Sequence, residues 1–256
     1  MDTNLFSLIT AIFVGGAAGY LGSLMLTKKM ALVGDALGHV ALPGMGLALL
    51  WGFNVSAGAF VFLLFGILLI WLLETKTELS TETLVGVIFV FSLALGFLIT
   101  PRLDLIEALV GDISRVSLAD AIAVVILSLA VFFVVRKIYQ RMILVSLSED
   151  LAVANKINVK KLNLIYLLAI SVIVALGIRV VGSLLIGALV IVPAATSRNF
   201  SRNMRQYVWG AIVLGIFSCV LGILLFKLTG FPVGPLTILV SVFFFIISLL
   251  FKSFKN

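Results

Sequence analysis

Nine apolar stretches of this chain are each long enough to cross a lipid bilayer as a helix. Inside the bilayer every backbone amide and carbonyl needs a partner within the protein, which favours helices over open sheets. We therefore predict an all-α, polytopic helical bundle that forms a single transmembrane domain over residues 1–256, with about nine spans, or eight if the broken second stretch is re-entrant. The stretches fall at about residues 5–27, 30–52, 55–73, 83–100, 118–136, 162–178, 180–197, 207–226 and 233–251.

Composition and charge agree with a membrane protein. Hydrophobic residues make up 62% of the chain, charged residues make up 11%, and the mean hydropathy is +1.30. The net charge of +7 is informative by position, because basic residues mark the cytoplasmic side of a membrane protein. We predict an N-terminus outside and a C-terminus in the cytoplasm, and no nucleic-acid partner. The outer loops then hold only Arg102, Arg115, Arg179 and Lys227, and the other 14 of the 18 lysines and arginines lie in cytoplasmic loops.

An aspartate and the only histidine of the chain, Asp35 and His39, lie four residues apart in the second apolar stretch. Ionisable side chains at membrane depth cost at least roughly 2.5–3.5 kcal/mol each, so they need a partner or a purpose. Their spacing places them on one helix face, where a carboxylate and an imidazole suit a divalent metal ion. A structural role, with His39 bonded to another helix and Asp35 paired with a lysine or capping a helix, is the alternative.

Two prolines interrupt apolar stretches. Pro43 has no amide hydrogen, so the carbonyl of His39 loses its helical partner, and Gly44 follows directly. We expect a kink or an unwound turn at the histidine. Pro193 removes a helical hydrogen bond in the same way in the seventh stretch. We expect these residues to serve as joints.

The loop at residues 146–161 is the longest predicted cytoplasmic loop. Ser148 is suited to cap a short helix, with Glu149 and Asp150 in its first turn and Asn155 or Asn158 at its end. A transporter presents such a helix to a motor domain, whereas the plainer interpretation is a solvated helical loop.

Five motifs together resemble the membrane permeases of ABC importers for zinc, manganese and iron. They run in order along almost the whole chain. They are residues 34–44 (GDALGHVALPG), 82–89 (ETLVGVIF), 109–113 (LVGDI), 181–196 (VGSLLIGALVIVPAAT) and 231–235 (FPVGP).

The resemblance implies a homodimeric, or pseudo-dimeric, permease in a prokaryotic cell membrane. It would receive metal from an extracytoplasmic binding protein and would be driven by a pair of cytoplasmic ABC ATPase subunits. Asp35 and His39 become pore-lining metal contacts. Glu82 and Asp112 are weaker candidates, for which a role as solvated helix caps is favoured over a place in the ion path. Residues 148–160, including Ala154, become the helix that couples to the ATPase. The metal is the transported substrate, and no permanently bound cofactor is expected.

The chain departs from the family pattern at two places. The family's glycine is missing from Asn155 to Asn158, which puts the coupling contacts in doubt, and Ser114 and Arg115 replace a small pair after Asp112. No Gly-x4-Gly-Lys-Ser/Thr motif occurs, so we expect a permease that does not itself hydrolyse ATP.

Three other functions compete with metal import by an ABC permease. A permease for a metal chelate or vitamin, of the siderophore or cobalamin type, shares the architecture but leaves the Asp35–His39 pair unexplained. An ATP-independent metal carrier or channel needs no motor. An intramembrane metalloprotease needs ligands such as His-Glu-x2-His, which one histidine cannot supply. Zinc, manganese and ferrous iron all suit the pair.

Overall fold

The computed structural model describes residues 3–100, 116–183 and 185–253, and these residues form helices joined by short connections, with no strand among them. The all-α prediction is confirmed. The helices are α1 (Thr3–Thr27), α2 (Val33–Val40), α3 (Leu42–Trp51), α4 (Val55–Lys76), α5 (Thr81–Ile99), α7 (Leu118–Leu147), α8 (Glu149–Ala154), α9 (Val159–Val181), α10 (Ile186–Phe200), α11 (Met204–Thr229) and α12 (Val233–Ser253).

Polar residues begin most of these helices. The side chain of the N-cap residue accepts a hydrogen bond from a free backbone amide in the first turn, which stabilises the helix start. Ser117 forms a reciprocal capping box with Asp120 at the start of α7. The other residues with this role are Asn54, Ser80, Ser148, Asn158 and Asn203.

Eight helical segments in the described part of the chain are long and apolar enough to span a membrane. The second apolar stretch is one of them: α2 and α3 together cover Val33–Trp51. The predicted stretch at residues 180–197 corresponds instead to α10, a helix of 15 residues. At a rise of about 1.5 Å per residue, α10 is only about 22 Å long. The number of candidate spans is therefore eight because the seventh stretch is too short, and the broken second stretch still counts as a span.

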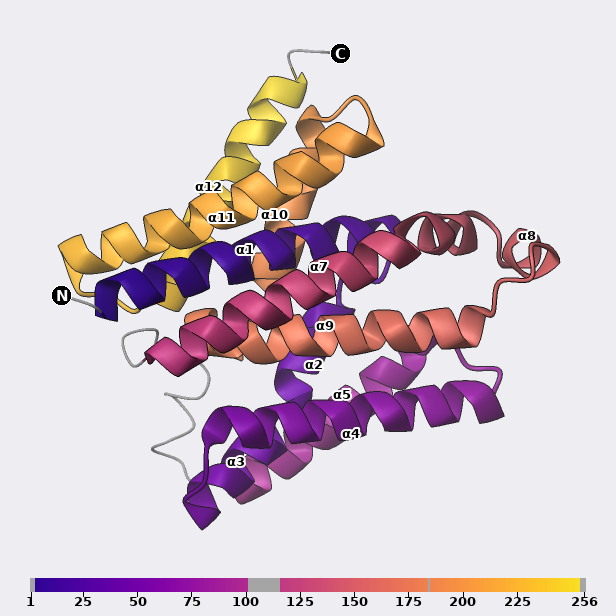
Figure 1. The fold of residues 1–256 in the computed structure, drawn as a ribbon, viewed down its shortest axis with the longest axis horizontal. Coiled ribbons are helices and arrows are strands. Elements are labelled where there is room, and N and C mark those ends of the chain that lie inside the picture. Colours follow the sequence, from indigo (N-terminus) through magenta and orange to yellow (C-terminus); the bar gives the residue numbers. More distant parts are fainter. Residues whose placement is uncertain (1–2, 101–115, 184, 254–256) are drawn as a thin grey trace.

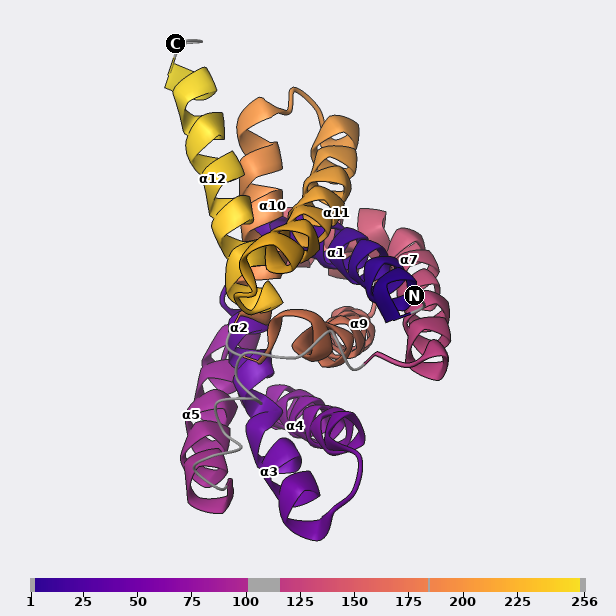
Figure 2. The same cartoon turned by 90° about the vertical axis from the view of Figure 1, so that its left-hand side faces the viewer.

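The helices form two groups that α2 connects. Figure 2 shows α10, α11 and α12 in the upper part of the bundle and α3, α4 and α5 in the lower part, with α2 between them. In Figure 1, α1, α7, α9 and α4 run roughly side by side, and α8 projects from the end of the bundle where α7 ends. This arrangement places α2, which carries Asp35 and His39, in the middle of the fold.

Small residues let α1 approach α10 and α11 closely. A side chain at Gly15 of α1 would meet the backbone carbonyl of Gly215 on α11, and one at Gly215 would meet the carbonyl of Gly15. Gly22 lies in the same way against the carbonyl of Val190 on α10. Close backbone contact of this kind is a main source of helix association in membranes.

Large apolar side chains cover much of the exterior. Phe65, Phe91, Phe133, Phe217 and Phe243 are each more than half exposed. A soluble monomer rarely presents so much apolar surface, whereas lipid chains accommodate it without cost. The surface is therefore that of a multi-pass membrane protein.

Candidate metal pathway

Helix α2 positions the aspartate–histidine pair at the centre of the bundle. Asp35 lies in its first turn and His39 in its last turn, so the two residues are one helical turn apart, as the spacing predicted. His39 is 9% exposed and Asp35 is partly buried. The structure thus keeps two ionisable side chains together in an otherwise apolar interior.

The ring of His39 is oriented by the backbone of its own helix. Its Nδ1 atom lies 3.0 Å from the carbonyl oxygen of Asp35. A carbonyl can only accept, so Nδ1 carries the proton and donates it. In the neutral ring the lone pair is then on Nε2, which is the state a metal-binding histidine needs. Phe89 of α5 packs edge-on against the ring, with centroids 5.3 Å apart.

Helix α10 holds the other side of the pair. A side chain at Gly187 would collide with the Cα and Cβ atoms of Asp35, both 2.5 Å from the position of its Cβ. One turn further along α2, Gly38 lies against the carbonyl of Ser183 and the side chain of Ile186. Only glycine lets α10 approach Asp35 this closely. Gly187 belongs to the long motif at residues 181–196, and its contact with Asp35 could not be inferred from the sequence.

The helix is interrupted directly after the pair. Helix α2 ends at Val40, α3 begins at Leu42 with Pro43 in its first turn, and the carbonyl of His39 accepts from the amide of Ala41. The predicted interruption is confirmed. It lies at Ala41, two residues beyond the histidine. Gly44 lies against the carbonyl of Gly58 on α4. Pro193 lies within α10, which runs from Ile186 to Phe200 without a break.

The remaining acidic candidates do not join the pair in the described part of the chain. Glu82 is exposed in the first turn of α5, where a carboxylate also complements the helix dipole. Asp112 lies outside the described residues. No group of three or more possible His, Cys, Asp or Glu ligands occurs among the residues that the structure describes. In the described part of the chain, the candidate ligands that lie together are therefore Asp35 and His39.

The cytoplasmic helix predicted near residues 148–160 is shorter than expected. Helix α8 spans only Glu149–Ala154, with the Ser148 hydroxyl accepting from the amide of Leu151 and Asn155 at the C-cap. Lys156 then takes a positive φ of 59°. Asn158, which stands where the family has glycine, instead caps α9 by accepting from the amide of Lys161. The departure from the family pattern therefore gives α9 a defined start.

A polar cluster that the sequence does not predict lies at the same end of the bundle. The Lys28 ammonium donates to Asn163 Oδ1 at 2.9 Å, and Asn163 Nδ2 donates to Glu74 Oε1 at 3.0 Å. Thr81 also donates to Glu74 Oε1, at 2.7 Å, and Lys28 lies 5.1 Å from the ring centroid of Tyr166. The cluster joins α4, α5 and α9 to the residue that follows α1. Its members are distant in sequence, and no motif connects them.

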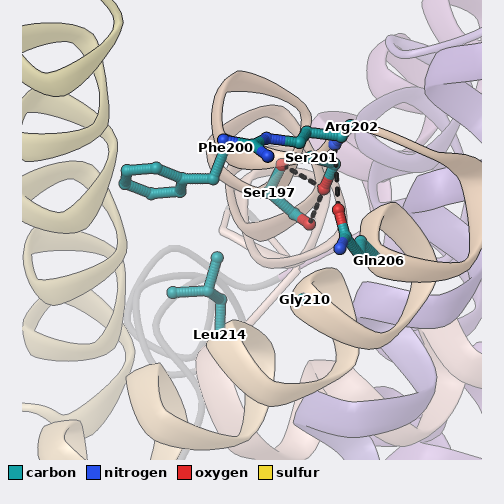
Figure 3. Close-up of a pocket in the computed structure, with 7 residues that line it drawn as sticks. All are labelled: Ser197, Phe200, Ser201, Arg202, Gln206, Gly210 and Leu214. Atoms are coloured by element: carbon teal, nitrogen blue, oxygen red, sulfur yellow. Dashed lines mark hydrogen bonds between the residues drawn. The ribbon is translucent and has the colours of Figure 1, made fainter.

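A hollow of about 420 Å³ lies where α10 turns into α11 (Figure 3). Beside it, Ser197 donates to the carbonyl of Tyr207 at 2.7 Å, and Gly210 leaves room for the Ser197 hydroxyl. The side chain of Gln206 accepts from the amide of Arg202 at 3.1 Å. These bonds hold α10 and α11 together, so a movement of α10 would carry α11 with it.

The fold and the site define an integral membrane transport protein, in which a buried carboxylate–imidazole pair lies beside a broken spanning helix. The chain belongs to the ABC 3 transport family, whose model matches residues 2–252. The family resemblance seen in the motifs is thereby confirmed. The chain is a permease subunit of an ABC transporter and is not itself the enzyme that hydrolyses ATP.

Individual relatives are similar over nearly their whole length. The high-affinity zinc uptake system membrane protein ZnuB of Haemophilus influenzae is 32% identical over 254 residues, which cover 95% of each chain. The manganese transport system membrane protein MntC of Listeria monocytogenes is 28% identical over 249 residues, covering 96% of this chain and 89% of that protein.

Two solved structures share the fold. PsaBC from Streptococcus pneumoniae in complex with Fab aligns with a TM-score of 0.83 and 26% identity, covering 97% of this chain and 91% of that one. A transporter described as being of the metal-chelate type, in an inward-facing conformation, aligns with a TM-score of 0.77 over 96% of this chain and 85% of that one. Its identity of 18% shows likeness of fold alone.

The charge state of Lys28 provides a testable prediction for the polar cluster. Burial lowers the pKa of Lys28 to about 8 from its ordinary 10.5, against the opposing effect of the nearby Glu74 and Glu149 carboxylates. Amine-reactive labelling of Lys28, followed by peptide mass spectrometry, should show a midpoint near pH 8. Glu74→Gln should lower that midpoint, because it removes a charge that favours the ammonium form.

Glu78→Gln is the matched control, since it removes a carboxylate from the exposed loop between α4 and α5. It should leave the midpoint unchanged. A wild-type midpoint at the ordinary value of 10.5 would contradict the burial of Lys28 in this cluster.

Proposed function

We propose that this chain is the transmembrane subunit of an ATP-driven importer for zinc or manganese, with ferrous iron as a third candidate. The observation that carries the proposal is the state of His39: its Nδ1 is bonded to the Asp35 carbonyl at 3.0 Å, which leaves Nε2 to bind a metal ion. The Asp35 carboxylate lies one turn away on the same helix. Permeases of zinc and manganese uptake systems are among the relatives of the chain.

Two chains together would complete the ion site. Zinc usually takes four ligands, and one chain offers a single imidazole and a single carboxylate. A homodimer with the two α2 helices facing its axis supplies two of each. Because the four ligands come from two chains, a movement of one chain relative to the other would release the ion, as transport requires. The ion is a substrate here and is not a resident cofactor.

Alternating access would move the ion past the pair. An extracytoplasmic binding protein delivers the metal, and cytoplasmic ABC ATPase subunits close on ATP and displace α8. The joints for that motion would be the interruption between α2 and α3 at Ala41, which Pro43 and Gly44 follow, and Pro193 within the continuous α10. Because Gly187 of α10 touches Asp35, a displacement of α10 changes the position of the carboxylate.

The orientation follows from charge and from the placement of the loops. In a prokaryotic cell membrane the N-terminus lies outside and the C-terminus lies in the cytoplasm. Helix α8 and the ends of α4 and α7 lie at one end of the bundle (Figure 1). The helix ends and connections there carry Lys76, Lys156, Lys160 and Lys161. The excess of basic residues marks this end as cytoplasmic.

A permease for a metal chelate or vitamin is the second candidate, because the structure of the metal-chelate type has the same fold. A chelate is recognised by the shape of a large cavity and does not need a bare imidazole. The two candidates therefore differ in what they require of Asp35 and His39.

Metal uptake by variants of the pair tests the proposal. Asp35→Asn and His39→Gln, expressed in a metal-starved host without its own importers and together with the ATPase and binding protein, should each lower uptake of radioactive zinc or manganese by at least about tenfold. Loss of one of two ligands per chain leaves too few donors to hold the ion. Assembly with the ATPase should be unchanged.

Glu78→Gln is the control for the loss of a carboxylate, and its uptake should match that of the wild type. The metal with the higher wild-type uptake is the preferred substrate. If both pair variants assemble and transport normally, the pair is structural and the chelate permease becomes the better proposal.

The coupling role of α8 can be tested separately. Leu151 and Val153 are 56% and 59% exposed, although Ala152 between them is buried. If α8 docks with the ATPase, Leu151→Ser with Val153→Ser should weaken co-purification of the ATPase by about tenfold or more, as the loss of a central apolar contact does. Metal uptake should fall in parallel.

Leu228→Ser is the matched control, because Leu228 is an apolar residue that is 82% exposed and lies near the C-terminal end of α11. Retention of full ATPase binding by the α8 double variant would assign the docking surface to another segment.

A further inference from the structure

A cavity of about 630 Å³ opens on the side of the bundle formed by α1, α7 and α11. Helix α1 lies between the other two (Figure 1) and forms its floor with Tyr20. Phe132 of α7 and Trp209 of α11 belong to its walls, and Trp209 is 57% exposed. We call this cavity the α1–α7–α11 groove. It lies away from α2 and takes no part in the proposed metal pathway.

The polar residues of the groove are basic or neutral. Arg136 and Gln140 come from successive turns of α7, and Arg205 comes from the first turn of α11. None of the described residues that line the groove is acidic, and no ion pair joins either guanidinium to a carboxylate in the described part of the chain. Two positive charges from different helices thus face one cavity without a counter-ion. Guanidinium groups bind phosphate through paired hydrogen bonds.

The length of α7 places Arg136 where a membrane surface is expected, and Arg205 lines the same groove. Arg136 is about 27 Å along α7 from Leu118 by helix rise, close to the hydrocarbon thickness of about 30 Å. In the proposed orientation this is the cytoplasmic surface. Trp209, Tyr20 and Tyr139 surround the same level, as aromatic residues do at a membrane interface. All three helices that form the groove are candidate spans, so its apolar walls face lipid chains.

We propose that the α1–α7–α11 groove binds an anionic phospholipid. The phosphate of the headgroup lies between Arg136 and Arg205, and one acyl chain follows the apolar wall beside Phe132 and Trp209. Basic pockets between spanning helices on the cytoplasmic side are suited to such headgroups. A soluble phosphate would satisfy the two guanidinium groups but would leave the apolar part of the groove unused. A bound lipid would wedge between α7 and α11, the helices on either side of α1.

Quenching of Trp209 by brominated lipids tests the proposal. The chain has three tryptophans, and Trp51→Phe with Trp71→Phe leaves Trp209 as the only tryptophan of the permease. The same sample with Trp209→Phe gives the signal of the ATPase, which is subtracted. The full chain with its ATPase partner is reconstituted in phosphatidylcholine vesicles that contain brominated phosphatidylglycerol or brominated phosphatidylcholine. Two basic residues near a membrane surface should give phosphatidylglycerol an association constant on the order of tenfold higher at Trp209.

Variants of the arginines separate charge from packing. Arg136→Gln with Arg205→Gln should reduce the preference to about onefold, whereas Arg136→Lys with Arg205→Lys should keep most of it because the charge remains. Lys137→Gln with Arg141→Gln is the matched control on α7, since both residues are exposed and lie outside the groove. This control should keep the full preference.

Three results would overturn the proposal. Equal quenching by the two lipids in the wild type would mean that the groove does not select charge. Quenching by neither lipid would mean that another protein surface covers Trp209. Loss of the preference when inorganic phosphate is added in excess would assign the two arginines to a soluble anion.

Discussion

The contact between Gly187 and the backbone of Asp35 is the constraint on which the functional part of this structure depends. It brings α10 against α2 at the helical turn that carries the ionisable pair Asp35 and His39. The same helix turn fixes the His39 ring through the carbonyl of Asp35. Packing and hydrogen bonding thus both involve Asp35. They fix the position of its carboxylate relative to the His39 imidazole in an apolar interior, where a charge without a partner is costly.

Two sets of contacts extend from this point toward the end of the bundle where α8 lies (Figure 1). Helix α10 is joined to α11 through Ser197 and Tyr207. The second set joins the end of α1 to α9 and α4 through Lys28, Asn163 and Glu74. Helix α9 is the next helix after α8 in the chain. A displacement of α8 would therefore be transmitted to the helices packed beside it, and α2 could change its angle to α3 at the interruption at Ala41. These contacts give alternating access a structural basis in a single chain.

The sequence predicted the features that depend on local chemistry. Apolar length located the helices, the i, i+4 spacing located the pair, Pro43 located the interruption, and Ser148 located the start of α8. Features that depend on tertiary contact were not accessible. The sequence could not show that Gly187 meets Asp35, that His39 uses Nδ1 internally, or that Lys28 and Glu74 share Asn163. The short α10 was counted as a full span, because apolar composition does not show where a helix begins. The sequence offered Asn155 or Asn158 as the end of the helix that begins at Ser148; Asn155 ends α8, whereas Asn158 caps α9.

The most direct test of the metal assignment is the zinc X-ray absorption spectrum of the permease–ATPase complex, loaded with zinc in the absence of ATP. The account predicts a shell of mixed nitrogen and oxygen ligands at about 2.0–2.2 Å, with imidazole scattering that disappears in His39→Gln. His39 is the only histidine of the chain, so in the permease this signal has a single source. A spectrum of wild-type complex without imidazole scattering, or one that His39→Gln leaves unchanged, would contradict the assignment.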